Sequence, residues 1–324
     1  MKILVTGGFG FIGGRVSQYL HQVGHEVTIG TRRIKNEDEN PFGLKVVRTD
    51  WHDSDQLESI CKGIDLVIHA AGMNNSDCML HPNEAIKVNG LATSTLLEAA
   101  KKQGVRKMFY FSTAHVYASL LEGTISEESS PLNLHPYATS NLIGEKVVLA
   151  ANAEVDFYGI VLRLSNGFGV PISSSVNCWM LLVNDLCRQA IEIGSLNLAS
   201  TGMQVRNFIS MSKICSSIGA LVSKLETGKI DKKNDSIYNL GGQQSMTVYE
   251  MTQFIQSRCK IVLGFEPAIN RPLSAIDERP VKLNYVSKKI EKLLGPIEDN
   301  YEIEVDQLLN YCNFFFSKPV NFIN

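Results

Sequence analysis

A glycine-rich segment near the N-terminus restricts the fold of this chain more than any other feature. The segment TGGFGFIG, residues 6–13, lies between an apolar run at 2–6 and an amphipathic stretch at 11–23. Gly7, Gly10 and Gly13 allow a tight turn and a close approach to an anion, where a helix N-terminus offers free N–H groups. The segment predicts a dinucleotide-binding turn that includes Phe11 and Ile12. The alternative is a tight turn without a ligand.

Short apolar runs alternate with amphipathic stretches through the first half of the chain. The runs predict strands at 2–6, 26–30, 44–48, 66–69, 107–112 and 159–164. The predicted helices lie near 11–23, 53–62, 83–104 and 136–152, and Pro136 suits the first turn of the last one. Nearly continuous apolar strands separated by helices indicate a parallel sheet covered on both faces. The sequence therefore predicts an α/β fold with a doubly wound parallel sheet, the Rossmann arrangement.

This alternation stops after about residue 165. The remaining sequence predicts a helix near 176–192, a pair of strands near 196–209, and helices near 211–225, 247–258 and 301–316. Such a mixture is typical of a smaller α+β lobe. We predict a dinucleotide-binding domain at 1–165 and a C-terminal substrate-binding lobe at 166–324, with a possible crossing of the chain between them near 205–245.

Composition argues against several classes of function. The 31 Lys and Arg residues nearly balance the 33 Asp and Glu residues, and the net charge of −2 gives no basis for nucleic-acid binding. No apolar stretch approaches the ~20 residues that a membrane span needs. The 7 cysteines form no metal-ligand pattern. We expect a cytoplasmic protein with reduced thiols, no metal, no membrane contact and a small-molecule substrate.

The end of the second predicted strand bears on the choice of cofactor. In dinucleotide sites an acidic residue at this place binds the ribose 2′-hydroxyl of NAD. This chain has Thr31 there, followed by Arg32 and Arg33. A guanidinium group suits a 2′-phosphate, so the sequence favours NADP, with NAD as the alternative. If NAD is the cofactor, the two arginines are ordinary solvated residues.

Three further segments have a recognisable order and spacing. Asp50 and Trp51 follow the third predicted strand, VIHAAG occupies 67–72, and Asn89 lies in KVNG at 87–90. Together with TGGFGFIG they resemble the extended short-chain dehydrogenase/reductases, in particular the NAD(P)-dependent epimerase/dehydratase family. The resemblance implies that Asp50 contacts the adenine and that Asn89 is structural. It also implies a backbone contact to the cofactor at the small residues Ala70, Ala71 and Gly72.

Two segments resemble the active centre of this family. FSTAHVY at 111–117 is similar to its F-S-S/T-x-x-V-Y segment, which implies that Thr113 polarises a substrate oxygen. PYATSNLIGE at 136–145 is similar to its P-Y-x-x-S-K-x-x-x-E segment, which implies that Tyr137 is the general acid/base. Asn141 replaces the family's lysine in the catalytic group and can supply a hydrogen bond but no charge. His115 and His135 are candidates to compensate.

The second half of the chain resembles the nucleotide-sugar enzymes of the family. RLSNGFG at 163–169 is similar to R-x-x-N-x-Y-G, in which the asparagine contacts the sugar diphosphate, so Asn166 inherits that role. GMQVRNFI at 202–209 is similar to G-x-x-x-R-D-F-I, whose arginine pairs with phosphate, and this implies a phosphate clamp at Arg206. Arg279 is the candidate for a second phosphate arginine, and Arg271 competes for that role.

Departures from the family restrict the predicted reaction. Its dehydratases carry an acid pair after the catalytic threonine, whereas this chain has Ala114 and His115, so dehydration is disfavoured. Hydride transfer at a sugar carbinol or ketone remains, either 4-epimerisation or keto-sugar reduction. Asn141 keeps an alternative open, a catalytically weak NAD(P)-binding sensor or partner-binding protein. The resemblance also implies a homodimer through the helices near 83–104 and 136–152.

Overall fold

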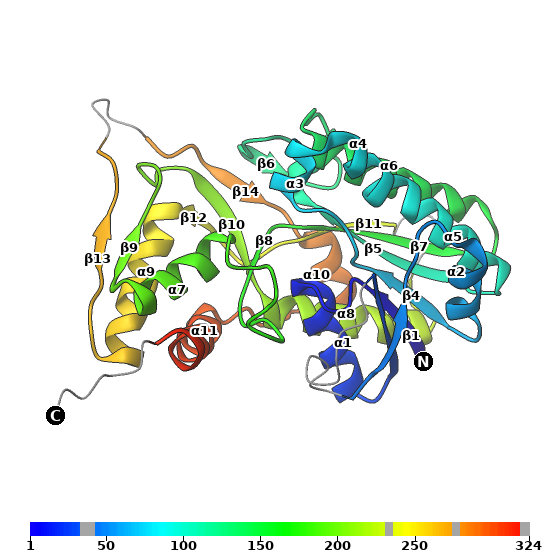
Figure 1. Ribbon diagram of the computed structural model, residues 1–324. Coiled ribbons are helices and arrows are strands. Elements are labelled where there is room, and N and C mark those ends of the chain that lie inside the picture. Colours follow the sequence, from blue (N-terminus) through cyan, green and yellow to red (C-terminus); the bar gives the residue numbers. More distant parts are fainter. Residues whose placement is uncertain (33–42, 231–235, 274–278, 318–324) are drawn as a thin grey trace.

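A seven-stranded parallel sheet forms the centre of the computed structural model, which describes residues 1–32, 43–230, 236–273 and 279–317 (Figure 1). The strand order is β11-β7-β5-β4-β1-β2-β3, and all neighbouring strands pair in parallel. This confirms the predicted doubly wound α/β fold. The strands are β1 (Lys2–Thr6), β2 (Glu26–Thr31), β3 (Lys45–Arg48), β4 (Leu66–His69), β5 (Lys107–Thr113), β7 (Tyr158–Leu164) and β11 (Ile237–Leu240).

Helices cover both faces of this sheet. One face carries α1 (Phe11–Gln22), α8 (Met211–Glu226) and α10 (Lys288–Leu294). The opposite face carries α2 (Ser54–Cys61), α5 (Ala92–Lys102) and α6 (Pro136–Ala150). Strand alternation sends Ile3 and Val5 to the α1 face and Leu4 to the other, and all three side chains are fully buried. A sheet buried on both faces explains why its strands read as continuous apolar runs.

The segment between β4 and β5 is more broken than the predicted helix at 83–104. It contains α3 (Asn75–Leu80), α4 (Pro82–Ala85) and a π-helical turn (Ile86–Leu91) that continues into α5. Two short 3₁₀ turns follow later in the chain, at Ala114–Val116 and Ala151–Ala153. π-Helical turns are rare and occur frequently at functional sites. Here the turn contains Asn89.

The C-terminal lobe is built around a three-stranded sheet of β8 (Asn166–Phe168), β10 (Val205–Ser210) and β12 (Ser245–Thr247). Its core lies between α7 (Leu182–Glu192), α9 (Val248–Leu263) and α11 (Tyr301–Phe316). Two short parallel pairs complete the described structure, β9 (Ser195–Asn197) with β13 (Ala268–Asn270), and β6 (Gly123–Ile125) with β14 (Leu283–Tyr285).

Two details of the predicted C-terminal lobe were wrong. The strands predicted as a pair near 196–209 do not pair with each other, because β9 pairs with β13 while β10 lies between β8 and β12. The segment between β9 and β10 instead contacts the start of α9, where the Tyr249 amide donates to the Gly202 carbonyl. The helix predicted at 176–192 begins only at Leu182. Before it, the Ser173 hydroxyl accepts from the Ser175 amide at 3.3 Å, a local bond of the kind that competes with helix formation.

The main sheet takes one strand from the C-terminal half of the chain. β11 pairs with β7 at the sheet edge, with Tyr238 opposite Leu162. Helices α8 and α10 also pack on this sheet rather than in the C-terminal lobe. The chain therefore runs from the sheet to the C-terminal lobe and back more than once, and the boundary at residue 165 stays a prediction.

Candidate active site

The residues predicted to bind a dinucleotide lie along one edge of the main sheet. They follow the C-terminal ends of β4, β1, β2 and β3, which are neighbours in the sheet. In open parallel sheets ligands bind outside these ends, where the strand order reverses, here between β1 and β4. The group consists of Gly7, Gly10, Phe11, Ile12, Gly13, Thr31, Arg32, Asp50, Trp51, Ala70, Ala71 and Gly72.

The glycine turn packs directly against the backbone that follows β4. Gly7 has φ of 68°, and a Cβ at this position would lie 2.7 Å from the Ala71 nitrogen and 2.8 Å from the Ala70 carbonyl carbon. A Cβ at Gly13 would collide with the Gly7 carbonyl oxygen. Only glycine therefore allows both the turn and its contact with the small residues after β4.

The N-terminus of α1 opens above this turn. Gly10 is its N-cap, no side chain caps the first turn, and that turn carries no acidic residue. The first N–H groups of a helix lack acceptors within the helix, and its dipole favours an anion at this end. The α1 N-terminus thus fits a pyrophosphate.

The far end of the same edge carries the residues that bear on adenosine recognition. Arg32 is exposed, whereas the Asp50 carboxylate accepts from Arg48 Nη2 at 3.3 Å and from the His52 amide at 3.1 Å. The Trp51 indole N–H is buried and has no acceptor among the described residues. Arg33 lies outside the described residues. Arg32 thus lies exposed beyond the end of β2, and the Asp50 carboxylate pairs with Arg48.

The two residues predicted to act on the substrate oxygen are brought together. Thr113 ends β5 and Tyr137 lies in the first turn of α6, and the Thr113 side chain lies close enough to lower the pKa of Tyr137. Tyr137 remains partly accessible to solvent. Burial of the rest of its ring raises the pKa of Tyr137, and the nearby Thr113 hydroxyl offsets part of that shift. Tyr137 therefore holds its proton at neutral pH.

Two histidines flank this pair. Asn133 joins them, since its Nδ2 donates to the His115 carbonyl at 2.7 Å and its Oδ1 accepts from the His135 amide at 3.0 Å. His135 caps α6, accepting at Nδ1 from the Tyr137 amide at 3.1 Å. Burial lowers the pKa of His115, and the nearby charges of Arg206 and His135 lower it further. His135 is thus a positioning residue for Tyr137, and His115 is neutral at neutral pH.

Asn141 is engaged within the protein at both ends of its side chain. It is 7% exposed, its Nδ2 donates to the Tyr137 carbonyl at 2.8 Å, and its Oδ1 accepts from the Tyr110 hydroxyl at 3.2 Å. The Tyr110 ring passes so close to Gly144 that a Cβ there would collide with it. Sequence reasoning missed Tyr110, because its contact with Asn141 depends on how α6 packs on β5. Asn141 supplies no charge to Tyr137.

A buried ion pair supports the strand that ends in Thr113. Arg163 Nη2 lies 2.6 Å from Glu145 Oε2, and both side chains are almost fully buried. Ser112 donates to the same carboxylate at 2.5 Å. The Arg163 guanidinium also lies over the Tyr117 ring, 4.8 Å from its centroid. Sequence reasoning missed this network, although both charged residues lie in the motifs that located Tyr137 and Asn166.

The predicted phosphate-binding residues meet only in part. β8 and β10 pair in parallel, and Asn166 Nδ2 donates to the Asn207 carbonyl at 2.8 Å, next to the exposed Arg206. Arg271 is used elsewhere, since its Nη1 donates to the Thr201 carbonyl and its guanidinium lies over the Tyr249 ring at 3.7 Å. Arg279 is exposed on the segment that leads to β14. The choice between Arg279 and Arg271 as the second phosphate arginine therefore stays a prediction.

A model of the NAD dependent epimerase/dehydratase family matches residues 3–241. Among curated proteins, the chain is 25% identical over 278 residues to a dTDP-glucose 4,6-dehydratase of Streptomyces niveus, covering 80% of this chain and 78% of the relative. It is 26% identical over 289 residues to an uncharacterized UDP-glucose epimerase of Bacillus subtilis, covering 83% and 86%.

Solved structures share the fold over almost the full length. MoeE5 in complex with UDP-glucose and NAD has a TM-score of 0.79 at 23% identity, covering 98% of this chain and 100% of MoeE5. UDP-glucuronic acid 4-epimerase from Bacillus cereus, in complex with UDP-glucuronic acid and NAD, has a TM-score of 0.77 at 22% identity, covering 97% and 99%. Within the described ranges, no helix is long and apolar enough to cross a membrane.

Proposed function

Because the chain belongs to the NAD-dependent epimerase/dehydratase family, we propose that it transfers a hydride between a nicotinamide dinucleotide and a nucleotide sugar. The nicotinamide supplies the hydride chemistry when bound. Thr113 holds the reacting sugar oxygen, Tyr137 exchanges a proton with it, and Arg206 binds the diphosphate. The dTDP- and UDP-sugars in the names of the relatives and in the solved complexes support this substrate class.

Reduction of a keto sugar is the direction that the neutral state of Tyr137 favours. Its raised pKa keeps the proton on the phenol, ready to be donated to the oxygen of a ketone as hydride arrives. Oxidation of an alcohol requires the phenolate, and Asn141 provides no charge to stabilise it. We therefore propose a keto-sugar reductase, with a 4-epimerase as the alternative because it must run both steps.

Single-turnover absorbance of the nicotinamide tests this proposal. The protein is mixed with reduced cofactor and dTDP- or UDP-4-keto sugars, and separately with oxidised cofactor and the corresponding alcohols. We expect reduction to be faster than oxidation. Interconversion of the 4-epimers would favour the epimerase. Absence of turnover with every sugar, despite tight cofactor binding, would favour the sensor or partner-binding protein, to which the internal hydrogen bonds of Asn141 also point.

We expect NADP to bind more tightly than NAD. Thr31 brings no carboxylate to repel a 2′-phosphate, and the exposed Arg32 can pair with it. Titration of both cofactors by fluorescence checks this preference. Arg32→Ala should weaken NADP binding by about tenfold and leave NAD binding unchanged. The family model and the solved complexes refer to NAD, so equal or NAD-favouring dissociation constants would assign NAD to this chain as well.

Arg206→Ala should weaken nucleotide-sugar binding by on the order of 2 to 4 kcal/mol, because a charge-assisted pair to phosphate is lost. Cofactor binding should not change, since Arg206 lies on β10 and not at the edge formed by β4, β1, β2 and β3. Calorimetry with UDP and with NADP separates the two. Arg271→Ala is the matched control, because Arg271 already contacts Thr201 and Tyr249. Loss of NADP binding in Arg206→Ala would contradict this placement.

A homodimer is expected through the π-helical turn and α6. Leu91 is 62% exposed and Ile143 39% exposed, and Ile86 is also exposed. Ile143 packs on Gly90, so the two helices present one apolar face. Light scattering should give twice the chain mass of 35.9 kDa, and Leu91→Glu should reduce it to one chain mass. Ile261→Glu on α9, equally exposed, should remain dimeric. A monomeric wild type at micromolar concentration would refute this arrangement.

A further inference from the structure

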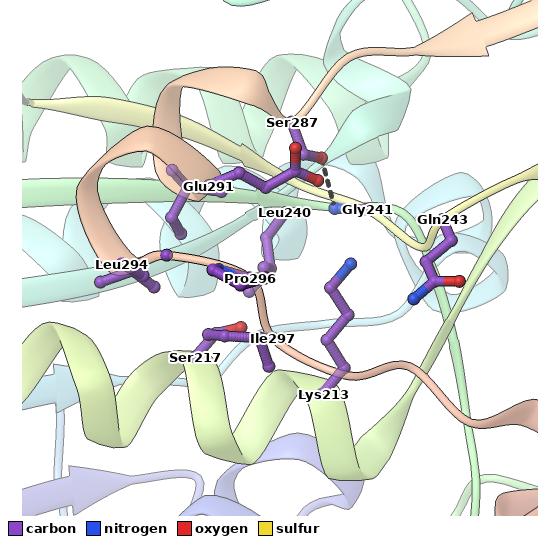
Figure 2. Close-up of a pocket in the computed structure, with 12 residues that line it drawn as sticks. Lys213, Ser217, Leu240, Gly241, Gln243, Ser287, Glu291, Leu294, Pro296 and Ile297 are labelled. Carbon is purple, nitrogen blue, oxygen red and sulfur yellow. Dashed lines mark hydrogen bonds between the residues drawn. The ribbon is translucent and has the colours of Figure 1, made fainter.

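A pocket of about 260 Å³ lies on the α8 face of the main sheet (Figure 2). It is bounded by α8, the end of β11, α10 and residues 295–297. Its apolar walls include Leu240, Ile290 and Leu294, and its polar groups include Lys213 and Glu291. None of its lining residues belongs to the predicted cofactor, catalytic or phosphate-binding groups, so the proposed function leaves it unexplained.

Lys213 is the buried cation of this pocket. It is 4% exposed, and it rises from α8 into the space below the end of β11 (Figure 2). Its Nζ makes no hydrogen bond to any described residue, and the Asp299 carboxylate lies 4.0 Å away. The Asp299 oxygens accept instead from the amides of Ser210 and Gln243 at 3.1 and 3.3 Å. An ammonium group offers three donors, and burial without an acceptor is costly.

This pocket lies on the other side of β10 from the predicted phosphate clamp. The Asn207 side chain points toward the loop after β11, where it bonds to both the amide and the carbonyl of Gly242. Side chains alternate along a strand, so its neighbour Arg206 points the opposite way. A ligand that contacts Lys213 therefore does not contact Arg206, and the two sites are separate.

We propose that this pocket binds a small organic monocarboxylic acid, with its carboxylate on Lys213 Nζ and its apolar body against Leu240, Ile290 and Leu294. The pocket offers one cation, which suits one negative charge. Asp299 behind the ammonium and Glu291 on the wall oppose a second, which disfavours phosphate dianions and dinucleotides. The apolar walls and small volume disfavour a sugar.

The probe for this site is 4-methylpentanoate, observed by saturation-transfer NMR with the dinucleotide site filled by NADP. We expect a dissociation constant on the order of 1 mM, as is typical of a ligand of this size. The uncharged analogue 4-methylpentan-1-ol should bind at least about tenfold more weakly, because it lacks the charge-assisted bond. No binding of the acid, or equal binding of acid and alcohol, would overturn the proposal.

Two variants test the pocket by different routes. The double variant Lys213→Met, Asp299→Asn removes both charges, so no lone buried carboxylate destabilises the fold. Ser217→Leu fills the pocket from α8. Both should weaken the acid at least about tenfold, while Arg206→Ala should bind it like wild type. Undiminished binding in both pocket variants would place the acid elsewhere. Because no sugar is used, this result is independent of the proposed oxidoreductase activity.

Discussion

Tyr137→Phe is expected to slow keto-sugar reduction by about 100- to 10,000-fold, which is the usual contribution of a general acid. Phenylalanine preserves the ring packing in the first turn of α6 and removes the only proton that Tyr137 can donate. The dissociation constant for the dinucleotide should stay unchanged, because the glycine turn and α1 are untouched. Single-turnover kinetics at saturating cofactor measure the loss directly.

Tyr158→Phe is the matched control for this experiment. Tyr158 begins β7, at the opposite end of the strand from the candidate site, so the same loss of a hydroxyl there should leave the rate unchanged. If Tyr137→Phe were equally silent in a protein that turns over, Tyr137 would not be the acid, and His115 would become the first residue to test.

Asn141→Lys tests the opposite reaction direction, alcohol oxidation. A lysine charge next to Tyr137 should lower its pKa and raise the rate of alcohol oxidation at pH 7 at least tenfold, equivalent to about 1.4 kcal/mol. Asn141→Met is the control for the lost bonds to Tyr110 and the Tyr137 carbonyl. Methionine is similar in length to lysine but carries no charge. Equal oxidation rates in the Lys and Met variants would show that charge at this position has no effect.

The second large effect concerns His69, which is fully buried at the end of β4. Its Nδ1 lies 2.6 Å from Thr6 Oγ1 and its Nε2 lies 3.0 Å from Thr93 Oγ1. Thr93 donates its own hydroxyl hydrogen to the Asn89 carbonyl at 2.8 Å, so it can only accept from Nε2–H. Nδ1 then accepts from Thr6. The hydrogen-bond network therefore selects one neutral tautomer of the imidazole.

Burial lowers the pKa of His69 to about 4, from an ordinary value of 6.5. Between pH 6.5 and 4 the unfolded chain binds a proton at His69 that the folded chain does not. The free energy of unfolding therefore falls over this range, and His69 causes no further change below pH 4. A difference of this size corresponds to about 3 kcal/mol. For a protein of ordinary stability, this is a large fraction of the total.

Urea unfolding at pH 6.5 and pH 4 checks this expectation. His69→Gln keeps a donor for Thr93 but cannot take up the proton, so its free energy of unfolding should fall by about 3 kcal/mol less than that of wild type over this range. His52→Gln, on the surface, controls for the removal of a histidine. If the His69→Gln and wild-type curves ran parallel, the folded protein would be protonating His69 at no extra cost.

The sequence predicted the parts of the fold that depend on local order. β1, the glycine turn and α1 follow from an apolar run, the turn glycines and an amphipathic stretch, and the structure has them within one residue of the expected bounds. The predicted pairing near 196–209 failed because short strands choose partners by tertiary packing. β9 has three residues, and its partner β13 lies some 70 positions later in the chain.

The candidate site likewise has features that the sequence predicts and features that depend on tertiary packing. The placement of dinucleotide-binding candidates at one sheet edge follows from strand order, and the proximity of Thr113 to Tyr137 followed from a motif resemblance. The bond between Tyr110 and Asn141 could not be predicted, because it depends on the depth at which α6 packs on β5 and on the space left by Gly144. Lys213 was missed for a related reason. A lysine in the first turn of an amphipathic helix is usually solvated, whereas here the end of β11, α10 and residues 295–297 enclose it.

The position of β11 at the edge of the main sheet has a consequence for biosynthesis. While the ribosome extends the chain, β7 is complete long before Ile237–Leu240 emerges, and until then the largely apolar edge of β7 has no partner. An unpaired apolar strand edge is a site for association with other nascent chains. A fragment that stops at residue 165 would keep that edge open permanently, so expression of the N-terminal half alone should give aggregates, whereas a fragment that extends through β11 closes the sheet.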